Sequence, residues 1–286
     1  MNDTHDVAST VHPGLWLVAT PIGNLDDLSP RAAAVLRAAD VVCCEDTRHS
    51  GSLLKRIGAA PQKLIVVNEH TEFDAIDEIA SLVSSGGTVA LVTDAGTPGV
   101  SDPGERVVAA LAERGLPVWA VPGPVAFVVA ATISGLPAGR IAFDGFLPRG
   151  GSERRERLTE VARERRTTVL YEAPHRLVAT VRDLHDACGG ERRIAIVREL
   201  TKMHEQVWRG TLAEALGHVE SVEPRGEHAI VVEPNPVSQV EISDEEIVAA
   251  LTQRTGAGLS TRDAVDEVTL AFGVPRKRVY SLAVTG

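Results

Sequence analysis

The fold prediction begins with residues 86–104, which read G-G-T-V-A-L-V-T-D-A-G-T-P-G-V-S-D-P-G. Residues 89–93 form a run that is apolar on both faces, as is typical of a strand inside a sheet covered on both sides. The strand ends at Asp94, and a helical pattern follows Asp102 and Pro103. Proline is tolerated in the first turn of a helix, and an aspartate before it is placed to cap the helix. The stretch therefore predicts a strand, a glycine- and proline-rich loop, and a helix that Asp102 caps.

The loop at residues 94–102 is a candidate ligand site. Ligands bind outside the carboxyl ends of strands in open α/β sheets. Small residues let a ligand approach backbone N–H and C=O groups directly. An ordinary tight connection between a strand and a helix is the alternative, and the density of glycine and proline favours the ligand site over it.

The first half of the chain alternates strands with helices, which predicts a parallel sheet with helices on both faces. Four strands end on polar or glycine- and proline-rich loops, and parallel strands bring such loops to one edge. Neither the dinucleotide fingerprint G-x-G-x-x-G nor a Walker A lysine loop is present, so a nucleotide-like ligand has to be held without them. The predicted strands span residues 15–19, 41–44, 64–67, 89–93 and 118–121, the predicted helices include residues 31–39, 53–57, 74–84 and 125–133, and the four loops read T-P-I-G-N, E-D-T-R, T-D-A-G-T-P and P-G-P.

The second half predicts another α/β unit, more antiparallel than the first. Strands are expected at residues 168–171, 194–197 and 229–233, and residues 207–211 are expected to start a helix that runs through Leu216. Residues 149–166 are rich in arginine, with glutamates interleaved. This stretch is either a solvated helix face that pairs with itself or a surface that contacts RNA, and the sequence leaves both open.

A proline-containing linker at residues 234–236 leads to short helices, a glycine turn and a basic last helix. This pattern is similar to a helix-turn-helix, and generic three-helix packing is the alternative. The predicted domains are a disordered lead-in at residues 1–13, α/β domains at residues 14–123 and 124–236, and a helical, helix-turn-helix-like module at residues 237–286.

Composition limits the classes of function. The 286 residues carry a net charge of -10, which argues against a coat of basic charge but leaves room for local basic surfaces. No apolar run approaches the ~20 residues that span a membrane, and the N-terminus lacks the features of a signal peptide. Cys43, Cys44 and Cys188 make an odd count and are expected to be buried thiols in a reducing cytosol rather than disulfides or a zinc site. We therefore expect a cytoplasmic protein.

Several short motifs occur in a fixed order along the chain. They are T-P-I-G-N-L-D-D-L-S at residues 20–29, E-D-T-R at 45–48, T-D-A-G-T-P-G-V-S-D-P-G at 93–104, P-G-P at 122–124, S-G-L-P at 134–137, Y-E-A-P-H-R at 171–176, R-E-L-T-K at 198–202 and G-E-H at 226–228. Together they resemble the tetrapyrrole-methylase-like class and, within it, the family of 16S ribosomal RNA cytidine 2′-O-methyltransferases. The resemblance covers residues 15–233, and the terminal helices also resemble that family's C-terminal extension. One departure is Val125, where a serine is expected after P-G-P; the lost hydroxyl would remove one hydrogen bond to the cofactor and leave backbone contacts in place.

The resemblance implies an α/β fold with two domains of the tetrapyrrole methylase type, a parallel sheet in the first and a mixed sheet in the second, followed by the small helical module. It implies a homodimer in which S-adenosylmethionine lies between the two α/β domains. No metal is needed, because the sulfonium is already activated. The residues expected to bind the cofactor are Pro21, Asp94, Gly96, Thr97, Val125, Ala126, Tyr171 and His228.

The implied reaction is methyl transfer to the ribose 2′-hydroxyl of a decoding-centre cytidine, cytidine 1402, in 16S ribosomal RNA. That hydroxyl is a poor nucleophile at neutral pH, so a base or a positioned polar group should help to remove its proton. In-line positioning could instead supply most of the rate, and a structural salt bridge is the alternative role for each candidate base. The candidates are Glu45, Asp46, Asp102, Lys202 and Glu205.

An acidic protein can hold 16S ribosomal RNA or the small subunit only where its basic groups are segregated. Two other functions stay open: methylation of a tetrapyrrole ring carbon on the same fold, and ribosome binding without catalysis. The arginine-rich stretch and the basic module favour RNA over a tetrapyrrole, and the intact D-A-G-T-P loop favours a catalyst over an inactive fold. The residues expected to face RNA are Arg48, Arg149, Arg154, Arg155, Arg176, Arg276, Lys277 and Arg278.

Overall fold

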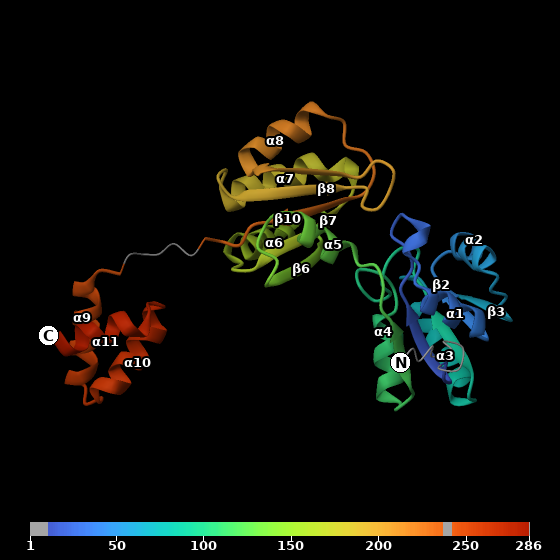
Figure 1. Ribbon diagram of the computed structural model, residues 1–286, viewed down its shortest axis with the longest axis horizontal. Coiled ribbons are helices and arrows are strands. Elements are labelled where there is room, and N and C mark those ends of the chain that lie inside the picture. Colours follow the sequence, from blue (N-terminus) through green and yellow to red (C-terminus); the bar gives the residue numbers. More distant parts are fainter. Residues whose placement is uncertain (1–10, 237–241, 286) are drawn as a thin grey trace, which may run out of the picture. The chain divides into compact units, whose positions relative to one another are not determined.

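The computed structural model describes residues 11–236 and 242–285 (Figure 1). The chain divides into two compact units, Met1–Asn235 and Pro236–Gly286. Residues 1–10 of the lead-in predicted at residues 1–13 lie outside the described residues. Residues 237–241 and 286 of the predicted helical module also lie outside them. None of the helices in the described ranges is long and apolar enough to cross a membrane.

The first unit contains a parallel sheet with the strand order β3-β2-β4-β1-β5, as the sequence predicts. Leu15 and Val89 pack with α3 and α4, whereas Trp16 and Ala90 pack with α1 and α2. Both faces are therefore covered, which explains why the strands are apolar throughout. The strands are β1 (Gly14–Val18), β2 (Val41–Cys44), β3 (Lys63–Val66), β4 (Thr88–Leu91) and β5 (Val118–Val121), and the helices are α1 (Pro30–Ala38), α2 (Thr47–Ile57), α3 (Glu72–Ser84) and α4 (Glu105–Glu113), with a short 3-10 helix at Leu25–Asp27.

The chain leaves the adjacent strands β1 and β4 toward opposite faces of this sheet. After β1 it continues into α1 on one face, and after β4 it continues into α4 on the other. The two loops therefore part at the carboxyl edge, which is where open α/β sheets bind ligands. The loop of residues 94–102, which was predicted to bind a ligand, follows β4 at this edge of the sheet.

The cap of α4 differs from the prediction. Asp102 does not cap the helix: Gly104 is its N-cap residue, at a φ of 131°. The buried side chain of Glu72 in α3 supplies the cap, and its Oε1 accepts from the amides of Gly104 at 2.9 Å and Arg106 at 3.0 Å. A Cβ on Gly104 would lie 2.9 Å from a Leu91 methyl group, so glycine is required here. Capping from a distant helix leaves Asp102 free for another role.

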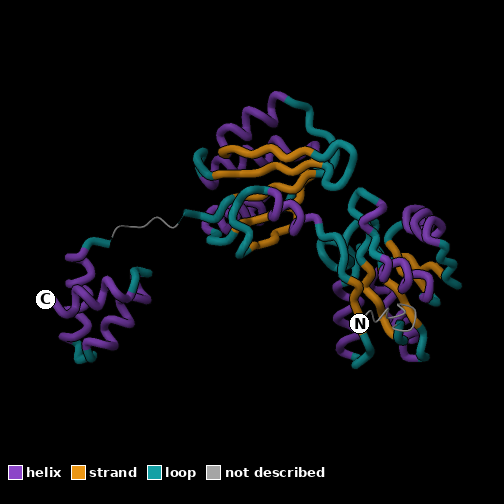
Figure 2. Tube along the Cα trace, viewed as in Figure 1, coloured by secondary structure: helices purple, strands orange, loops and turns teal. Residues whose placement is uncertain are grey.

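The second sheet of this unit is mixed, with the strand order β6-β7-β10-β8-β9. β6 runs parallel to β7 and the other neighbours are antiparallel, which confirms the more antiparallel character predicted for this half. Helix α5 packs on one face, and α6, α7 and α8 cover the other. Figure 2 distinguishes the helices and strands by colour. The strands are β6 (Ile141–Phe146), β7 (Thr167–Glu172), β8 (Arg193–Arg198), β9 (Gln206–Thr211) and β10 (His228–Val232), and the helices are α5 (Ala126–Ile133), α6 (Gly151–Arg163), α7 (Pro174–Cys188) and α8 (Leu212–Ser221).

Residues 207–211 form a strand and do not start a helix. They belong to β9, which pairs with β8 along its whole length. The helix begins at Leu212, where Thr211 and Glu214 form a capping box. Branched and aromatic side chains in this segment favour the strand, and the capping residues mark the true helix start. The sequence also failed to predict β6 and α7.

Within residues 242–285, the second unit contains three helices. Ile247, Val265, Val268 and Val279 are fully buried at its centre. Gly273, at a φ of 63°, ends the second helix and turns the chain toward the third. The helices are α9 (Asp244–Gly256), α10 (Thr261–Phe272) and α11 (Arg276–Thr285).

Candidate functional site

The loops that follow four strands of the parallel sheet meet at one edge. Thr20 and Gly96 exchange backbone hydrogen bonds of 2.8 and 3.1 Å, which join the loops after β1 and β4. The Thr97 hydroxyl donates at 3.1 Å to a carbonyl of P-G-P, the loop after β5. The Asp94 amide donates at 3.1 Å to Glu45 Oε1, in the loop after β2. The predicted convergence of these loops is therefore present.

A cavity of about 290 Å³ lies where these loops face the second sheet. Ser101 and Asp102 line it from the loop after β4, and His228 lines it from β10. A ligand in the cavity would therefore contact segments from both sheets. Its lining includes Ile22, Gly96, Thr97, Val100, Ser101, Asp102, Val125, Ala126, Phe146, Tyr171, Glu172, Leu200, Glu227 and His228.

The cavity brings together most of the residues predicted to bind a cofactor. Pro21 and Asp94 do not line it: Pro21 precedes the lining residue Ile22, and Asp94 sits one residue before the lining segment of its loop. The predicted residues that do line the cavity are Gly96, Thr97, Val125, Ala126, Tyr171 and His228.

The departure at Val125 has a structural counterpart. Val125 is the N-cap residue of α5, and its side chain cannot cap the helix as a serine would. The Tyr171 hydroxyl takes over part of this role, because it accepts from the Phe127 amide at 2.9 Å. Burial raises the pKa of Tyr171 to about 12, so its phenol stays protonated at neutral pH.

Several carboxylates lie at or near the cavity: Asp102 and Glu227 line it, whereas Glu45 and Asp94 do not. Burial, and then the charges of Glu45, Asp94 and Glu227, raise the pKa of Asp102 to about 7. Burial also raises the pKa of Glu45, and Asp94 adds to that shift. The negative potential that these groups create favours a cationic ligand. Among residues 11–236 and 242–285, no group of three or more His, Cys, Asp and Glu side chains is placed to hold a metal ion.

Asp46 and Arg48, from the E-D-T-R motif, are occupied by each other. Asp46 Oδ1 caps α2 by accepting from the Arg48 amide at 2.8 Å, and Oδ2 pairs with the Arg48 guanidinium at 2.7 Å. These bonds hold the pKa of Asp46 well below its usual range. This geometry gives Asp46 the role of a helix cap, and the cavity is lined by other residues.

Lys202 and Glu205 hold the R-E-L-T-K segment in shape. Lys202 Nζ donates to Glu199 at 2.9 Å and to Glu227 at 2.8 Å, and Glu205 accepts from the Thr201 amide at 2.6 Å. Glu199 and Thr201 adopt left-handed backbone conformations, with φ of 52° and 62°. Such strain persists only where surrounding contacts enforce it, and it is concentrated at functional sites. The residue between them, Leu200, lines the cavity.

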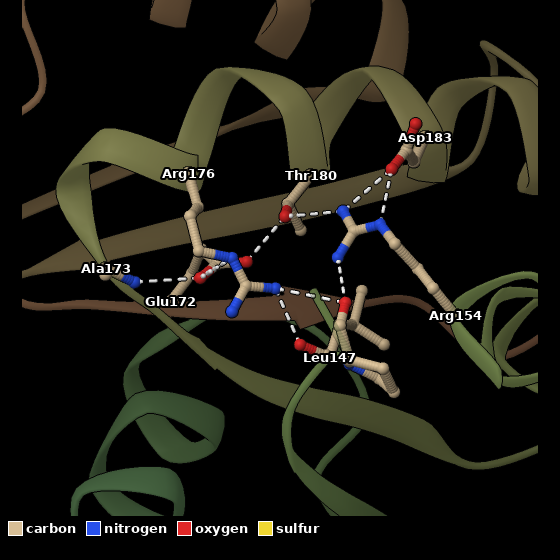
Figure 3. Close-up of polar contacts among 8 residues, drawn as sticks. Leu147, Arg154, Glu172, Ala173, Arg176, Thr180 and Asp183 are labelled. Carbon is tan, nitrogen blue, oxygen red and sulfur yellow. Dashed lines mark hydrogen bonds and ion pairs between the residues drawn. The ribbon is translucent and has the colours of Figure 1, made fainter. Parts of the chain in front are cut away.

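A buried polar network joins residues of the Y-E-A-P-H-R motif to α6 and α7 (Figure 3). Glu172, whose side chain is fully buried, accepts from the Ala173 amide at 2.9 Å and from the Thr180 hydroxyl at 2.5 Å, and it pairs with Arg176. Arg154 donates to the same hydroxyl at 2.9 Å and to Asp183 at 2.7 Å. The network ties the start of α7 to α6, directly behind a wall of the cavity.

The residues predicted to face RNA fall into three groups. Arg154 and Arg176 point into the buried network, so the prediction of an RNA-facing role is wrong for Arg154, which is 8% exposed. Arg149 and Arg155 are exposed, and their side chains have no polar partner among the described residues. The remaining members are Arg48, paired with Asp46; Arg276, paired with Asp266; Arg278, paired with Asp244; and Lys277, which is exposed.

Three features of the site were missed at the sequence level. Glu227 and Phe146 line the cavity, and Ser101 has a strained φ of 64° beside Asp102. The G-E-H motif contains Glu227 and could have indicated it. Ser101 lies in the loop at residues 94–102 that was predicted to bind a ligand, but it was not singled out there. Phe146 carries no local signal, because its role depends on where the second sheet faces the first.

Sequence comparison decides the family. The profile of the tetrapyrrole (corrin/porphyrin) methylases matches residues 14–216. A relative from Synechocystis sp., named ribosomal RNA small subunit methyltransferase I, is 40% identical over 272 residues, which cover 94% of this chain and 97% of the relative. The chain belongs to the ribosomal RNA small subunit methyltransferase I family of tetrapyrrole methylases. Proteins of the same name from Xylella fastidiosa (41% identical; 94% of this chain, 98% of the relative) and Mycobacterium tuberculosis (42% identical; 93% of each chain) agree.

Solved structures support the fold of this member of the ribosomal RNA small subunit methyltransferase I family. The methyltransferase CobJ matches with a TM-score of 0.59 at 20% identity, covering 77% of this chain and 94% of that chain. Uroporphyrin-III C-methyltransferase from Thermus thermophilus, in complex with S-adenyl homocysteine, matches with a TM-score of 0.53 at 24% identity, covering 77% and 97%. These likenesses confirm the predicted α/β fold of the tetrapyrrole methylase type, whose two sheets lie within the single compact unit Met1–Asn235.

Proposed function

We propose that this protein transfers a methyl group from S-adenosylmethionine to the 2′-hydroxyl of a decoding-centre cytidine, cytidine 1402, in 16S ribosomal RNA. Relatives about 40% identical along nearly the whole chain are named ribosomal RNA small subunit methyltransferase I, which supports methylation of small-subunit RNA. The ribose 2′-hydroxyl and the cytidine follow from the resemblance of the sequence motifs at residues 45–48 and 171–176. The cavity supports it, because it lies at the carboxyl ends of parallel strands, where ligands bind in this class of sheet.

The polar groups around the cavity fit S-adenosylmethionine. Asp94 Oδ1 and His228 Nδ1 are buried, and neither has a hydrogen-bond partner among the described residues. Buried polar atoms nearly always have a partner, so both favour a polar ligand. The carboxylates of Asp94, Asp102 and Glu227 suit the positive sulfonium and ammonium groups of this cofactor. We assign the backbone groups of Gly96 and Ala126 to contact the remaining parts of S-adenosylmethionine.

The bound cofactor supplies an activated methyl group. We assign Asp102 to accept the proton that leaves the 2′-hydroxyl, because a base works best when its pKa is close to the working pH. His228 lines the same cavity, and burial, followed by the charge of Arg198, lowers its pKa. Its ring is therefore neutral and able to orient a hydroxyl or an amine through one hydrogen bond.

We also propose a two-fold homodimer, the commonest closed assembly. The composition of α5 supports it, because Ala130 and Ala131 are buried against the second sheet while Val128 is 42% exposed. Light scattering at micromolar concentration should give twice the chain mass of 30.4 kDa. The mass of a single chain would contradict the dimer.

Mapping ribose methylation on small-subunit RNA from cells with and without this protein tests the proposed reaction. We expect one decoding-centre cytidine to lose its 2′-O-methyl group, a plasmid copy to restore it, and an Asp102→Asn copy to restore much less. An unchanged map would overturn the proposal. In that case a loss of tetrapyrrole products would support the ring-carbon alternative, and retained binding to the subunit would support a non-catalytic role.

A further inference from the structure

The cavity assigned to the cofactor shares a wall with a second hollow. We name this hollow the Arg149 groove; it measures about 790 Å³ and is lined by residues 146–149 together with Ala173, His175 and Arg176. Phe146 and Ala173 line both the groove and the cavity. A molecule in the groove would therefore lie beside a molecule in the cavity.

The two hollows differ in charge. The cavity wall carries carboxylates, including Asp102 and Glu227. The ionisable side chains of the groove are Arg149, His175 and Arg176, and none of the described residues that line it is acidic. In a protein with a net charge of -10, this contrast places an anion-binding surface next to a cation-binding one.

The basic groups at the mouth of the groove are available to a ligand. Arg149 and His175 are exposed, and their side chains make no hydrogen bond or ion pair with another described residue. Helices α6 and α7 begin beside the groove, and neither has a side-chain cap. The start of a helix carries partial positive charge, so α6 adds to the potential that attracts a phosphate. At the start of α7 the Glu172 carboxylate accepts from the Ala173 amide and offsets this charge.

Phe146 presents an aromatic surface at the shared wall. Its side chain is 53% exposed, and Tyr171 contacts it edge-on at 5.7 Å between ring centroids. An exposed aromatic ring beside an arginine is the combination on which unpaired nucleotides stack. Phe146 therefore suits a base, and Arg149 suits the phosphate next to it.

The backbone between these two residues is fixed from behind by the buried network (Figure 3). Arg176 donates to the Leu147 carbonyl at 2.6 Å, and Arg154 donates to the Pro148 carbonyl at 2.8 Å. Binding groups held on a fixed backbone lose less entropy when a ligand arrives. The two inward arginines act as positioning residues for the groove.

We infer that the Arg149 groove binds the acceptor nucleotide of a single-stranded RNA segment. Phe146 stacks on a base, Arg149 and His175 contact an adjoining phosphate, and the ribose between them lies at the wall shared with the cavity. The inference rests on the proposed function and deepens it by naming the subsite that RNA occupies. A tetrapyrrole, whose carboxylates are also anionic, is the occupant that the test has to distinguish.

The test compares groove variants with matched controls in the full-length protein. Arg149→Ala is matched by Arg140→Ala, an exposed arginine at the opposite end of β6, and Phe146→Ala is matched by Phe73→Ala, a 75% exposed phenylalanine on α3. The probe is a decoding-centre RNA hairpin in a filter-binding salt titration, followed by steady-state methylation of small subunits and calorimetry with S-adenosylmethionine.

We expect Arg149→Ala to weaken RNA binding and to flatten the salt slope by about one unit, because one phosphate contact is lost. Phe146→Ala should raise the KM for small subunits about tenfold, and Phe146→Trp should restore it. Arg149 lines only the groove, so Arg149→Ala should leave cofactor affinity within about twofold of wild type.

The outcomes separate the groove from the proposed function. If the groove variants bind and methylate RNA as well as Arg140→Ala and Phe73→Ala do, the groove does not bind the acceptor nucleotide. The proposed function would still stand. Wild-type protein that methylates no RNA, with an RNA affinity that still depends on Arg149, would overturn the function and support the groove. A uroporphyrin that competes with the hairpin at equal concentration, in an Arg149-dependent way, would overturn RNA as the occupant.

Discussion

Replacing Arg154 by alanine should lower the free energy of unfolding much more than replacing its neighbour Arg155. Arg154 is 8% exposed, and its guanidinium donates to Asp183, Thr180 and the Pro148 carbonyl at 2.7 to 2.9 Å. Arg155 is exposed and has no polar partner among the described residues. Both lie within the same helix, so the change in helix propensity is equal in the two variants and cancels from the comparison.

The expected cost of Arg154→Ala follows from these contacts. Breaking a buried ion pair costs about 3–5 kcal/mol when the remaining charge is left buried. The Asp183 side chain is 38% exposed, so water can solvate it once the arginine is gone, and we lower the expectation to about 2–4 kcal/mol. The free energy of unfolding for Arg155→Ala should change by less than about 0.5 kcal/mol, as for an ordinary surface residue.

Thermal unfolding followed by circular dichroism measures the difference. For a unit of this size, 1 kcal/mol shifts Tm by about 2–4 °C, so Arg154→Ala should melt roughly 5–15 °C below wild type. Arg154→Lys should recover little of the lost stability. The compact ammonium group of lysine cannot reach the three separate acceptors that the planar guanidinium of arginine contacts. If Arg154→Ala melts within a degree or two of Arg155→Ala, the buried network does not stabilise the second sheet and this reasoning is wrong.

Three further changes test the site. Because burial and neighbouring carboxylates raise the pKa of Asp102 to about 7, kcat/KM should rise as pH passes through about 7 and then level off, and Asp102→Asn should abolish that rise. The same raised pKa means that Asp102 removes stability as pH rises from about 4 to 7, so Asp102→Asn should melt higher than wild type at pH 8; a lower Tm would contradict the shift. Asp94→Ala should weaken S-adenosylmethionine binding by about 1–3 kcal/mol in calorimetry, and an unchanged affinity in a folded variant would remove Asp94 from the site. Glu72→Ala should cost about 1–3 kcal/mol, with Glu72→Gln less damaging, because the start of α4 loses its acceptor; equal Tm values for wild type and Glu72→Ala would refute the long-range cap.

The parallel sheet was predictable because its signals are local. Its apolar strand segments and the polar, glycine- and proline-rich loops that follow them can each be recognised within a few neighbouring residues. β9 was missed because it ends at Thr211, where the capping box of α8 begins, and the predicted helix was extended back over the strand. Strand pairing depends on a partner elsewhere in the chain, which a short window cannot contain.

The sequence motifs predicted many of the residues that line the cavity, but not the side-chain contacts between distant segments that support it. Gly96, Thr97 and His228 come from motifs that the cavity brings together. Glu72 and Arg154 act through contacts with residues about 30 positions away, so the cap formed by Glu72 was not predicted and Arg154 was predicted to face RNA. The direction in which such a side chain points is set by tertiary packing.

We propose that this chain methylates a ribose and not a base or a tetrapyrrole, and the methylated product distinguishes these reactions. Purified protein is incubated with S-adenosylmethionine and small subunits from cells that lack it, and the RNA is then digested to nucleosides for mass spectrometry. We expect a stoichiometric amount of 2′-O-methylcytidine from the wild-type protein and much slower formation by Asp102→Asn. Methyl groups on the base alone, or no transfer to RNA by a protein that binds the cofactor, would contradict it.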